Sequence, residues 1–293
     1  MPRRCNAAVG ESLHTRDSDP LRKFTRHRRL NGAIARELYK DSGTIDVGRR
    51  IAQCAQILGL DLYEDEQGVE AELRAMRPCN ARLCPFCEWR RTRAWRKRLF
   101  TGLEGFQAQE PKRVPLFLTL TVPNPPMEAL RATLREMTAG WHRLVSSKAF
   151  PTDTWFRRTE VTVGSGIHIC NATAHPHFHA LLMVKPSYFG KGYITQLEWQ
   201  KRWTKAMRSD IPLVVDIRRV RPSTRQTSES GSGSSPSESV SKSAVLEVAK
   251  YMAKGTQLVE MADQLPEFHR QMGGLKLYAV SKSLRRFISE GLI

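Results

Sequence analysis

The sequence predicts an α+β fold, and three observations support this class. Short runs rich in β-branched and aromatic residues, typical of strands, alternate with segments whose apolar residues recur every three or four positions, typical of helices. Of the 293 residues, 40% are hydrophobic, which is ordinary for a globular protein and sufficient for a core without disulfides. No run of about 18 apolar residues is present, so no membrane span is expected.

The elements expected within the core, residues 112–290, combine strands and helices in one layered domain. In order they are a strand at 114–122, a helix at 127–147, strands at 156–163 and 175–185, a helix at 194–208, a strand at 212–220, a helix at 244–255, and a short strand and closing helix within 273–290. PNPP ends the first strand, and Gly255 is placed to end the 244–255 helix.

The expected organisation has three parts. Residues 1–47 form a basic, partly disordered arm with a short helix after Asn31, residues 48–111 a cysteine-rich module, and residues 112–293 a catalytic domain. Helical spacing is present at 48–60. Segment 223–243 contains ten serines in 21 positions and is predicted to be a flexible linker.

The chain is strongly basic, with 47 Lys and Arg against 29 Asp and Glu and a net charge of +18. Nucleic acid is the expected polyanionic partner. An anionic membrane surface is the alternative, but no basic amphipathic helix with an aromatic face supports it. The first residues contain no apolar secretion signal, so the cytoplasm is the expected location, where the six cysteines would be reduced or metal-bound.

The most distinctive stretch is HPHFHALLMV, with histidines at 175, 177 and 179. Residues two apart in a strand share a face, so His177 and His179 project together. His175 is a further candidate metal ligand that would point the same way, although Pro176 favours a bend or strand start there. Two imidazoles on one face form half of a site for a divalent metal. The alternative is a set of histidines hydrogen-bonded at a sheet surface.

A third metal ligand is expected from FRRTEVTV, at 156–163. If this strand pairs antiparallel with 177–184, the Glu160 carboxylate lies beside the two imidazoles. Two histidines and one carboxylate leave positions open for substrate oxygens, as catalysis requires. The alternative is a surface glutamate paired with Arg157 or Arg158.

The 244–255 helix carries a candidate nucleophile. Glu247 and Tyr251 are four residues apart and share a helix face, as do Lys250 and Lys254. Nearby lysines would favour the phenolate of Tyr251 and hold a phosphate. Taken alone, the segment is also compatible with an amphipathic helix that buries its tyrosine.

The cysteines form a second constellation. Cys79, Cys84 and Cys87, with Cys54 upstream, have spacing suited to a structural Zn²⁺, whereas lone buried cysteines or a redox CxxC are the alternatives. Cys5 and Cys170 have no evident partner. The next segment is predicted to grip DNA phosphates, unless it is only a solvated helix face. Its candidate DNA-binding residues are Arg90, Arg91, Arg93, Arg96 and Arg98, with Lys250 from the later helix.

Three blocks in order make the chain resemble the single-tyrosine replication initiators of rolling-circle plasmids, a branch of the HUH endonucleases. The blocks are FLTLTVPN at 117–124, HPHFHALLMV at 175–184 and EVAKYMAKG at 247–255. The resemblance implies an antiparallel HUH sheet with helices on one side, preceded by a zinc-binding module. It also implies that Tyr251 is the nucleophile, that His177, His179 and Glu160 hold metal, and that Glu247 activates water. The serine-rich insertion departs from the family pattern.

The implied activity is metal-dependent nicking and joining of DNA, with Mg²⁺ or Mn²⁺ as catalytic metal and a 5′-phosphotyrosine intermediate. Single-stranded or extruded origin DNA is the expected substrate, and a host helicase and polymerase are the expected partners. Relaxases and tyrosine transposases of the same superfamily share this chemistry. A non-catalytic zinc-containing DNA-binding regulator is the alternative from another class.

Overall fold

The computed structural model describes residues 22–65, 68–163, 173–220 and 261–290, together with Val245 and Leu258. The chain divides into two compact units, each described here by itself. The first comprises the described residues of Met1–Arg91 and Lys254–His269, and the second those of Thr92–Ala253 and Arg270–Ile293. The predicted division into arm, cysteine module and catalytic domain stays a prediction. The serine-rich segment and the 244–255 helix lie outside the described residues, apart from Val245.

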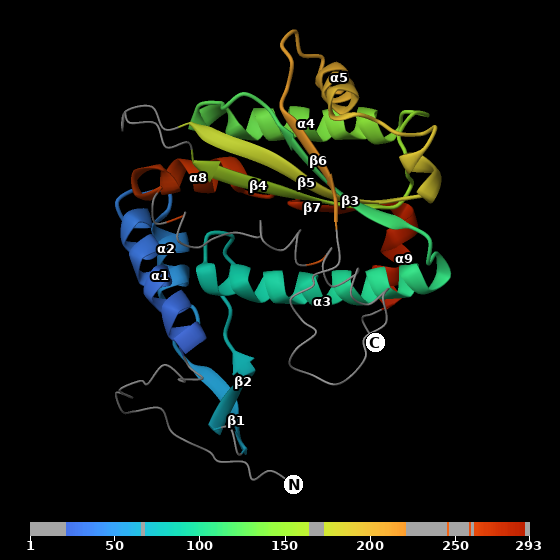
Figure 1. Ribbon diagram of the computed structural model, residues 1–293. Helices are drawn as coiled ribbons and strands as arrows, with labels where there is room; N and C mark the ends of the chain where they lie inside the picture. Colours follow the sequence, from blue (N-terminus) through green and yellow to red (C-terminus); the bar gives the residue numbers. More distant parts are fainter. Residues whose placement is uncertain are drawn as a thin grey trace. The chain divides into compact units, whose positions relative to one another are not determined.

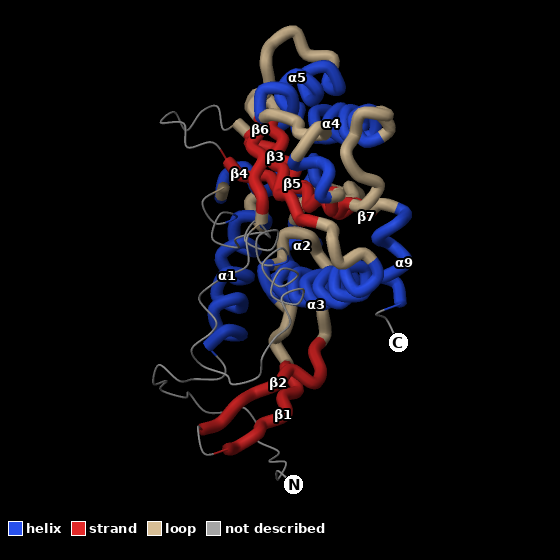
Figure 2. The backbone as a smooth tube through the Cα atoms, turned by 45° about the vertical axis from the view of Figure 1, so that its right-hand side comes forward, coloured by secondary structure: helices blue, strands red, loops and turns tan. Residues whose placement is uncertain are grey.

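The first unit pairs two helices and carries a hairpin. Its elements are α1 (Arg22–Leu38), α2 (Ile45–Ala52), β1 (Leu58–Asp65), β2 (Gly68–Met76), the start of α3 (Pro85–Gln109) and the short η4 (Ala262–Gln264). Buried Phe24 of α1 packs its ring on Phe86 and Trp89 of α3, with ring centroids 6.2 and 5.6 Å apart. The antiparallel β1–β2 ribbon, drawn in red in Figure 2, was not among the expected elements.

The second unit is built on a five-stranded antiparallel sheet in the order β6-β3-β5-β4-β7 (Figure 1). Its strands are β3 (Val114–Thr121), β4 (Trp155–Val163), β5 (Ala174–Val184), β6 (Val215–Arg219) and β7 (Tyr278–Val280). The predicted α+β class and antiparallel sheet are therefore confirmed. The central strand β5 buries every residue except half-buried His175 and His177.

One face of this sheet is covered by α4 (Leu130–Val145) and α5 (Gln196–Met207) (Figure 1). Trp141 of α4 and Trp203 of α5 both contact Phe178 of β5, with ring centroids 6.4 Å apart in each pair. Helix α5 begins at a capping residue, because the Thr195 hydroxyl accepts the Glu198 N–H at 3.2 Å. The remaining helices of this unit are η1 (Met127–Ala129), η2 (Pro186–Phe189) and α8 (Leu265–Met272), which begins in the first unit.

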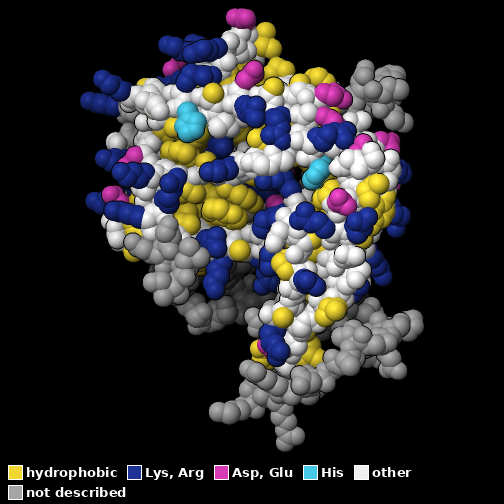
Figure 3. Space-filling view, turned by 180° about the vertical axis from the view of Figure 1, so that it is seen from behind, with side chains coloured by type: hydrophobic (Ala, Val, Ile, Leu, Met, Phe, Trp, Pro, Cys, Tyr) yellow, Lys and Arg dark blue, Asp and Glu magenta, His cyan; other side chains and the backbone are white. Residues whose placement is uncertain are grey.

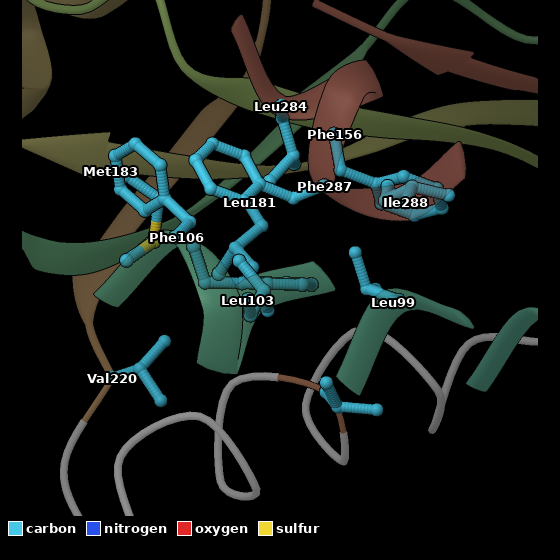
Figure 4. Close-up of a cluster of buried hydrophobic side chains, with 12 residues drawn as sticks. Leu99, Leu103, Phe106, Phe156, Leu181, Met183, Val220, Leu284, Phe287 and Ile288 are labelled. Atoms are coloured by element: carbon cyan, nitrogen blue, oxygen red, sulfur yellow. The ribbon is translucent and has the colours of Figure 1, made fainter. Parts of the chain in front are cut away.

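The opposite face is covered by α3 from Thr92 onward and by α9 (Lys282–Glu290), which corrects the expectation that helices lie on one side only. Figure 4 shows the side chains of Leu99, Leu103 and Phe106 of α3 gathered with those of Leu181 and Phe287. The physical reason is that the run ALLMV in β5 is apolar on both faces, so both faces must be covered. Among the described residues, no helix is both long and apolar enough to cross a bilayer.

Candidate functional site

The histidines of β5 share one sheet face. His175, His177 and His179 alternate with Pro176 and Phe178, and Phe178 points to the α4 side. The rings of His175 and His177 have centroids 4.8 Å apart, and those of His177 and His179 are stacked at 5.8 Å. The strand thus presents an aligned row of imidazoles.

Glu160 reaches this row from the neighbouring strand. β4 and β5 pair antiparallel with Glu160 opposite His177, and the Glu160 Oε2 atom lies 2.8 Å from Nε2 of His179. His179 is buried, and its other ring nitrogen, Nδ1, lies 3.1 Å from the Thr119 hydroxyl of β3. Three adjacent strands therefore fix the orientation of one imidazole.

His177 lies between the other two rings and is half-buried. Burial, followed by repulsion from His179 and His175, outweighs the attraction of the Glu160 carboxylate and lowers the pKa of His177 to about 4. The ring is therefore neutral near pH 7, which is the state in which imidazole binds metal.

The donor types on this face fit a divalent cation. Nε2 of His179 and Oε2 of Glu160 lie 2.8 Å apart, close to the roughly 3 Å between neighbouring ligands of a six-coordinate ion with bonds near 2.1 Å. His177 can supply a further nitrogen from the same face. Thr119 would then act on the metal through His179 as an orienting partner.

The cysteine centre lies in the first unit, and it brings more potential metal ligands together than the histidine face does. The Sγ atoms of Cys54, Cys79, Cys84 and Cys87 all lie within 4.8 Å of one another, and three of the four cysteines are buried. The Cys87 sulfur is 3.5 Å from that of Cys54 and 3.8 Å from that of Cys79. A tetrahedral zinc site with Zn–S bonds near 2.3 Å has sulfur–sulfur edges of about 3.8 Å. The four cysteines therefore fit one zinc ion.

Two backbone N–H groups donate hydrogen bonds to cysteine sulfurs of this centre. The Ala81 N–H donates to Cys79 Sγ and the Cys87 N–H to Cys84 Sγ, each at 3.4 Å. Hydrogen bonding from the Cys54 thiol lowers the pKa of Cys87, whereas hydrogen bonding with Cys54 raises the pKa of Cys84. The close thiols thus favour at least one thiolate, the form that binds zinc.

Two polar side chains tie the cysteine loop to the helices of the first unit. Buried Asn31 of α1 accepts the Phe86 N–H at 3.4 Å and donates to the Cys54 carbonyl at 3.5 Å. Arg50 of α2 donates to the Cys79 carbonyl at 2.6 Å. The loop is therefore positioned from both helices, a role for Asn31 and Arg50 that the sequence did not reveal.

The candidate DNA-binding arginines all lie on α3. The Arg91 side chain holds the cysteine loop, because it donates to the carbonyls of Asn80 and Ala81. It also forms an ion pair with Glu88 at 3.1 Å. Arg90 donates to the Asn80 side chain at 3.1 Å. Arg93 and Arg96 are exposed, and Arg98 is half-buried. On the face drawn in Figure 3, Lys and Arg side chains are widespread and Asp and Glu side chains sparse.

Some predicted residues lie outside the described chain. Tyr251, Glu247, Lys250 and Lys254 belong to this group, so their placement relative to the histidines stays a prediction. The neighbouring tryptophans of α3 are accounted for by packing. Trp95 stacks on Tyr278 at 4.7 Å, and Trp89 packs on Phe24.

One residue at the histidine site was missed by reasoning from sequence. Thr119 lies opposite His179 in the β3–β5 ladder, and the alternation LTLT in 118–121 places Thr119 and Thr121 on the histidine face. That alternation was the available signal, but only the strand register identifies which histidine each threonine meets.

The fold and the site define an α+β protein with an antiparallel sheet, a row of histidines beside a glutamate, and four cysteines that could hold a metal ion. Comparison with known proteins identifies the family to which the chain belongs. Residues 70–291 match the sequence profile of the family described as "Replication protein". The chain belongs to this family, which confirms the resemblance found in its motifs. No solved structure shows a significant match.

Three curated relatives called "Protein rep" illustrate the similarity. The chain is 35% identical over 218 residues to one from Bacillus amyloliquefaciens and 34% over 218 residues to one from a Bacillus species, in each case over 72% of this chain. It is 32% identical over 241 residues, 80% of this chain, to one from Streptococcus pneumoniae. These alignments span 60%, 67% and 68% of the relatives' lengths, so the chain covers about three-fifths of the first.

Proposed function

We propose that this chain initiates rolling-circle replication of a plasmid by nicking and rejoining one DNA strand at the origin. The observation that carries the proposal is the Glu160 carboxylate 2.8 Å from His179 Nε2, on strands of a segment that matches the replication protein family. The order of the three motif blocks and the net charge of +18 add support. The reaction would take place in the cytoplasm, where plasmid DNA resides.

In the proposed reaction, the Tyr251 phenol oxygen attacks the scissile phosphorus. An O–P bond to tyrosine forms and the bond from phosphorus to the 3′ oxygen breaks. The phenol proton passes to solvent, and the departing oxygen takes a proton from solvent to become a 3′-hydroxyl. Lys250 and Lys254 would stabilise the phenolate and the phosphate. A bound Mg²⁺ or Mn²⁺ supplies charge neutralisation at the non-bridging oxygens.

The 5′-phosphotyrosine link conserves the phosphodiester, so attack by a later 3′-hydroxyl can restore the strand without ATP. Glu247 is proposed to take a proton from the water that ends the reaction. The free 3′-hydroxyl would prime a host polymerase, with a host helicase opening the duplex. His177, His179 and Glu160 would hold the metal, and the cysteine centre would hold Zn²⁺ as a structural ion.

The direct test is incubation of purified protein with a supercoiled plasmid carrying its own origin and Mg²⁺ or Mn²⁺. The expected product is a relaxed circle with polypeptide attached to one 5′ end. Tyr251→Phe should abolish the attachment and retain DNA binding, whereas the exposed Tyr193→Phe should behave as wild type. Absence of an adduct in the wild type would favour the non-catalytic regulator, whereas an adduct in Tyr251→Phe would assign the nucleophile to a different residue.

Relaxases and tyrosine transposases would give the same covalent product. The substrate distinguishes them, because an initiator should cleave its own plasmid origin in preference to a transfer origin or a transposon end. The "Protein rep" names of the relatives favour the initiator.

A further inference from the structure

A cavity lies in the second unit on the sheet face opposite the histidines. It has a volume of about 310 Å³ and lies between α4 and the edge formed by β4 and β7. Arg157 and Thr159 of β4 line it, and these residues alternate with Arg158 and Glu160, which face the histidine side. The cavity is therefore separate from the proposed catalytic site.

Arg157 is the unusual residue of this cavity. Its side chain is buried, with 3% of the residue exposed, and Nε and Nη1 have no hydrogen-bond partner. The guanidinium carbon lies 3.8 Å from the centroid of the Phe178 ring. Stacking on the ring uses the face of the guanidinium, but its N–H donors lie in the plane and remain unpaired.

A second arginine of the same unit, Arg113, has the carboxylate neighbours that Arg157 lacks in the described part of the chain. The side chain of Arg113 is 9% exposed, and it lies 3.6 Å from Glu110 and 3.8 Å from Asp153. Among the described residues, Arg157 has no carboxylate within salt-bridge distance. Burial lowers the pKa of Arg157 only to about 10, so the guanidinium stays charged at neutral pH. A buried unpaired charge is costly, and an anionic ligand would relieve this cost.

Basic and polar side chains line the rest of the cavity together with apolar ones such as Leu134 and Leu277. Arg135, Thr138 and His142 are spaced three and four residues apart, which sets them on one face of α4. Lys276, from the segment just before β7, also lines the cavity, and the residues that line it include no Asp or Glu. The lining thus combines one buried guanidinium with the cationic side chains of Arg135 and Lys276 and the hydroxyl of Thr159.

We propose that this cavity binds a phosphoryl group, with the Arg157 guanidinium as its principal donor and Arg135, Lys276 and Thr159 completing the site. Arginine suits the role because its planar fork of N–H donors matches phosphate oxygens. The volume is at the lower end for small-molecule pockets, suited to a phosphate with a small attached group. The phosphoryl group can belong to the backbone of bound DNA or to a free nucleotide.

Thermal unfolding of the full chain in phosphate, pyrophosphate and a deoxynucleoside monophosphate, each matched to chloride at equal ionic strength, tests the proposal. A ligand that binds the folded state raises Tm by several degrees when well above its Kd. The wild type should show this rise. Arg157→Met keeps the stem over Phe178 and should lose the rise, and its Tm in chloride should not fall. Arg113→Met should retain the ligand-dependent rise.

The salt dependence of single-stranded DNA binding identifies the source of the phosphate. A fall of about 1 in the log–log salt slope for Arg157→Met, but not for the exposed Lys148→Gln, indicates the DNA backbone. An unchanged slope with loss of the phosphate-dependent Tm rise indicates a free phosphate-bearing ligand. The proposal is overturned if the wild type shows neither effect, or if Arg157→Met retains the Tm rise.

Discussion

The cysteine centre and the histidine row differ in how fully the chain assembles them. Four sulfurs from the α2–α3 region converge within 4.8 Å of one another, whereas on the histidine face one imidazole and one carboxylate are joined and the other rings lie alongside. The first arrangement is closed and mostly buried, as a structural zinc site is. The second leaves His175 and His177 half-buried and accessible, as a site that admits a substrate must be. Closure and accessibility separate a structural centre from a catalytic one.

Removal of a cysteine ligand should have the largest effect. Cys84→Ser leaves three sulfurs, so we expect loss of stoichiometric zinc and of the folded first unit, because zinc binding in small sites contributes about 10 kcal/mol or more. Metal analysis and thermal unfolding measure both. Cys170→Ser, outside the proposed ligand set, should keep zinc. Full zinc content in Cys84→Ser would remove that cysteine from the site.

Glu160→Gln should preserve the fold and impair the histidine site. We expect metal-dependent nicking to fall by about 100-fold or more, since the change removes a proposed ligand and not merely an outer partner. Mn²⁺ titration and the nicking rate give the two readouts. The exposed Glu198→Gln, which affects only the ion pair with Arg202, is the matched control. Equal metal affinity in the two variants would contradict the role of Glu160.

Thr119→Val should have a smaller effect of the same kind. The valine preserves shape and removes the hydroxyl that lies 3.1 Å from His179 Nδ1, so metal affinity should fall by roughly 10-fold. Thr121→Val is the control, because the Thr121 hydroxyl donates to the Val214 carbonyl and to no histidine. If both variants lose affinity equally, the effect belongs to the strand and not to His179.

Arg96→Gln should have the smallest effect. Arg96 is exposed on α3, and loss of one phosphate contact should lower the log–log salt slope of DNA binding by about 1 with little change in Tm. Arg91→Gln should behave differently, since Arg91 holds the cysteine loop and its loss should weaken zinc retention. An unchanged slope in Arg96→Gln would exclude this arginine from the DNA contact.

The sequence predicted the elements whose pattern is local. Strands β3, β4, β5 and β6 and helices α4 and α5 all lie within about three residues of their predicted bounds, because alternation and helical spacing are recognised within short windows. The β1–β2 ribbon was missed because helical spacing was read through residues 48–60, whereas α2 ends at Ala52 and β1 begins at Leu58. The segment that forms α3 was recognised only by its positive charge.

The sequence could not predict the register in which neighbouring strands of the sheet pair. That Thr119 meets His179, and that Glu160 bonds His179 while standing opposite His177, depends on how β3, β4 and β5 align. Likewise, the sequence marked Arg157 only as a salt-bridge candidate for Glu160. The structure turns Arg157 to the other face, where it lines a cavity.

The burial of β5 on both faces limits how this segment can evolve. Exchange of one side chain for another of similar size disturbs a few contacts, but deletion or insertion of one residue reverses the orientation of every later side chain. The imidazoles would then exchange places with Phe178 and Ala180 beneath the tryptophans of α4 and α5. We therefore expect related chains to tolerate substitutions along this strand while keeping its length constant.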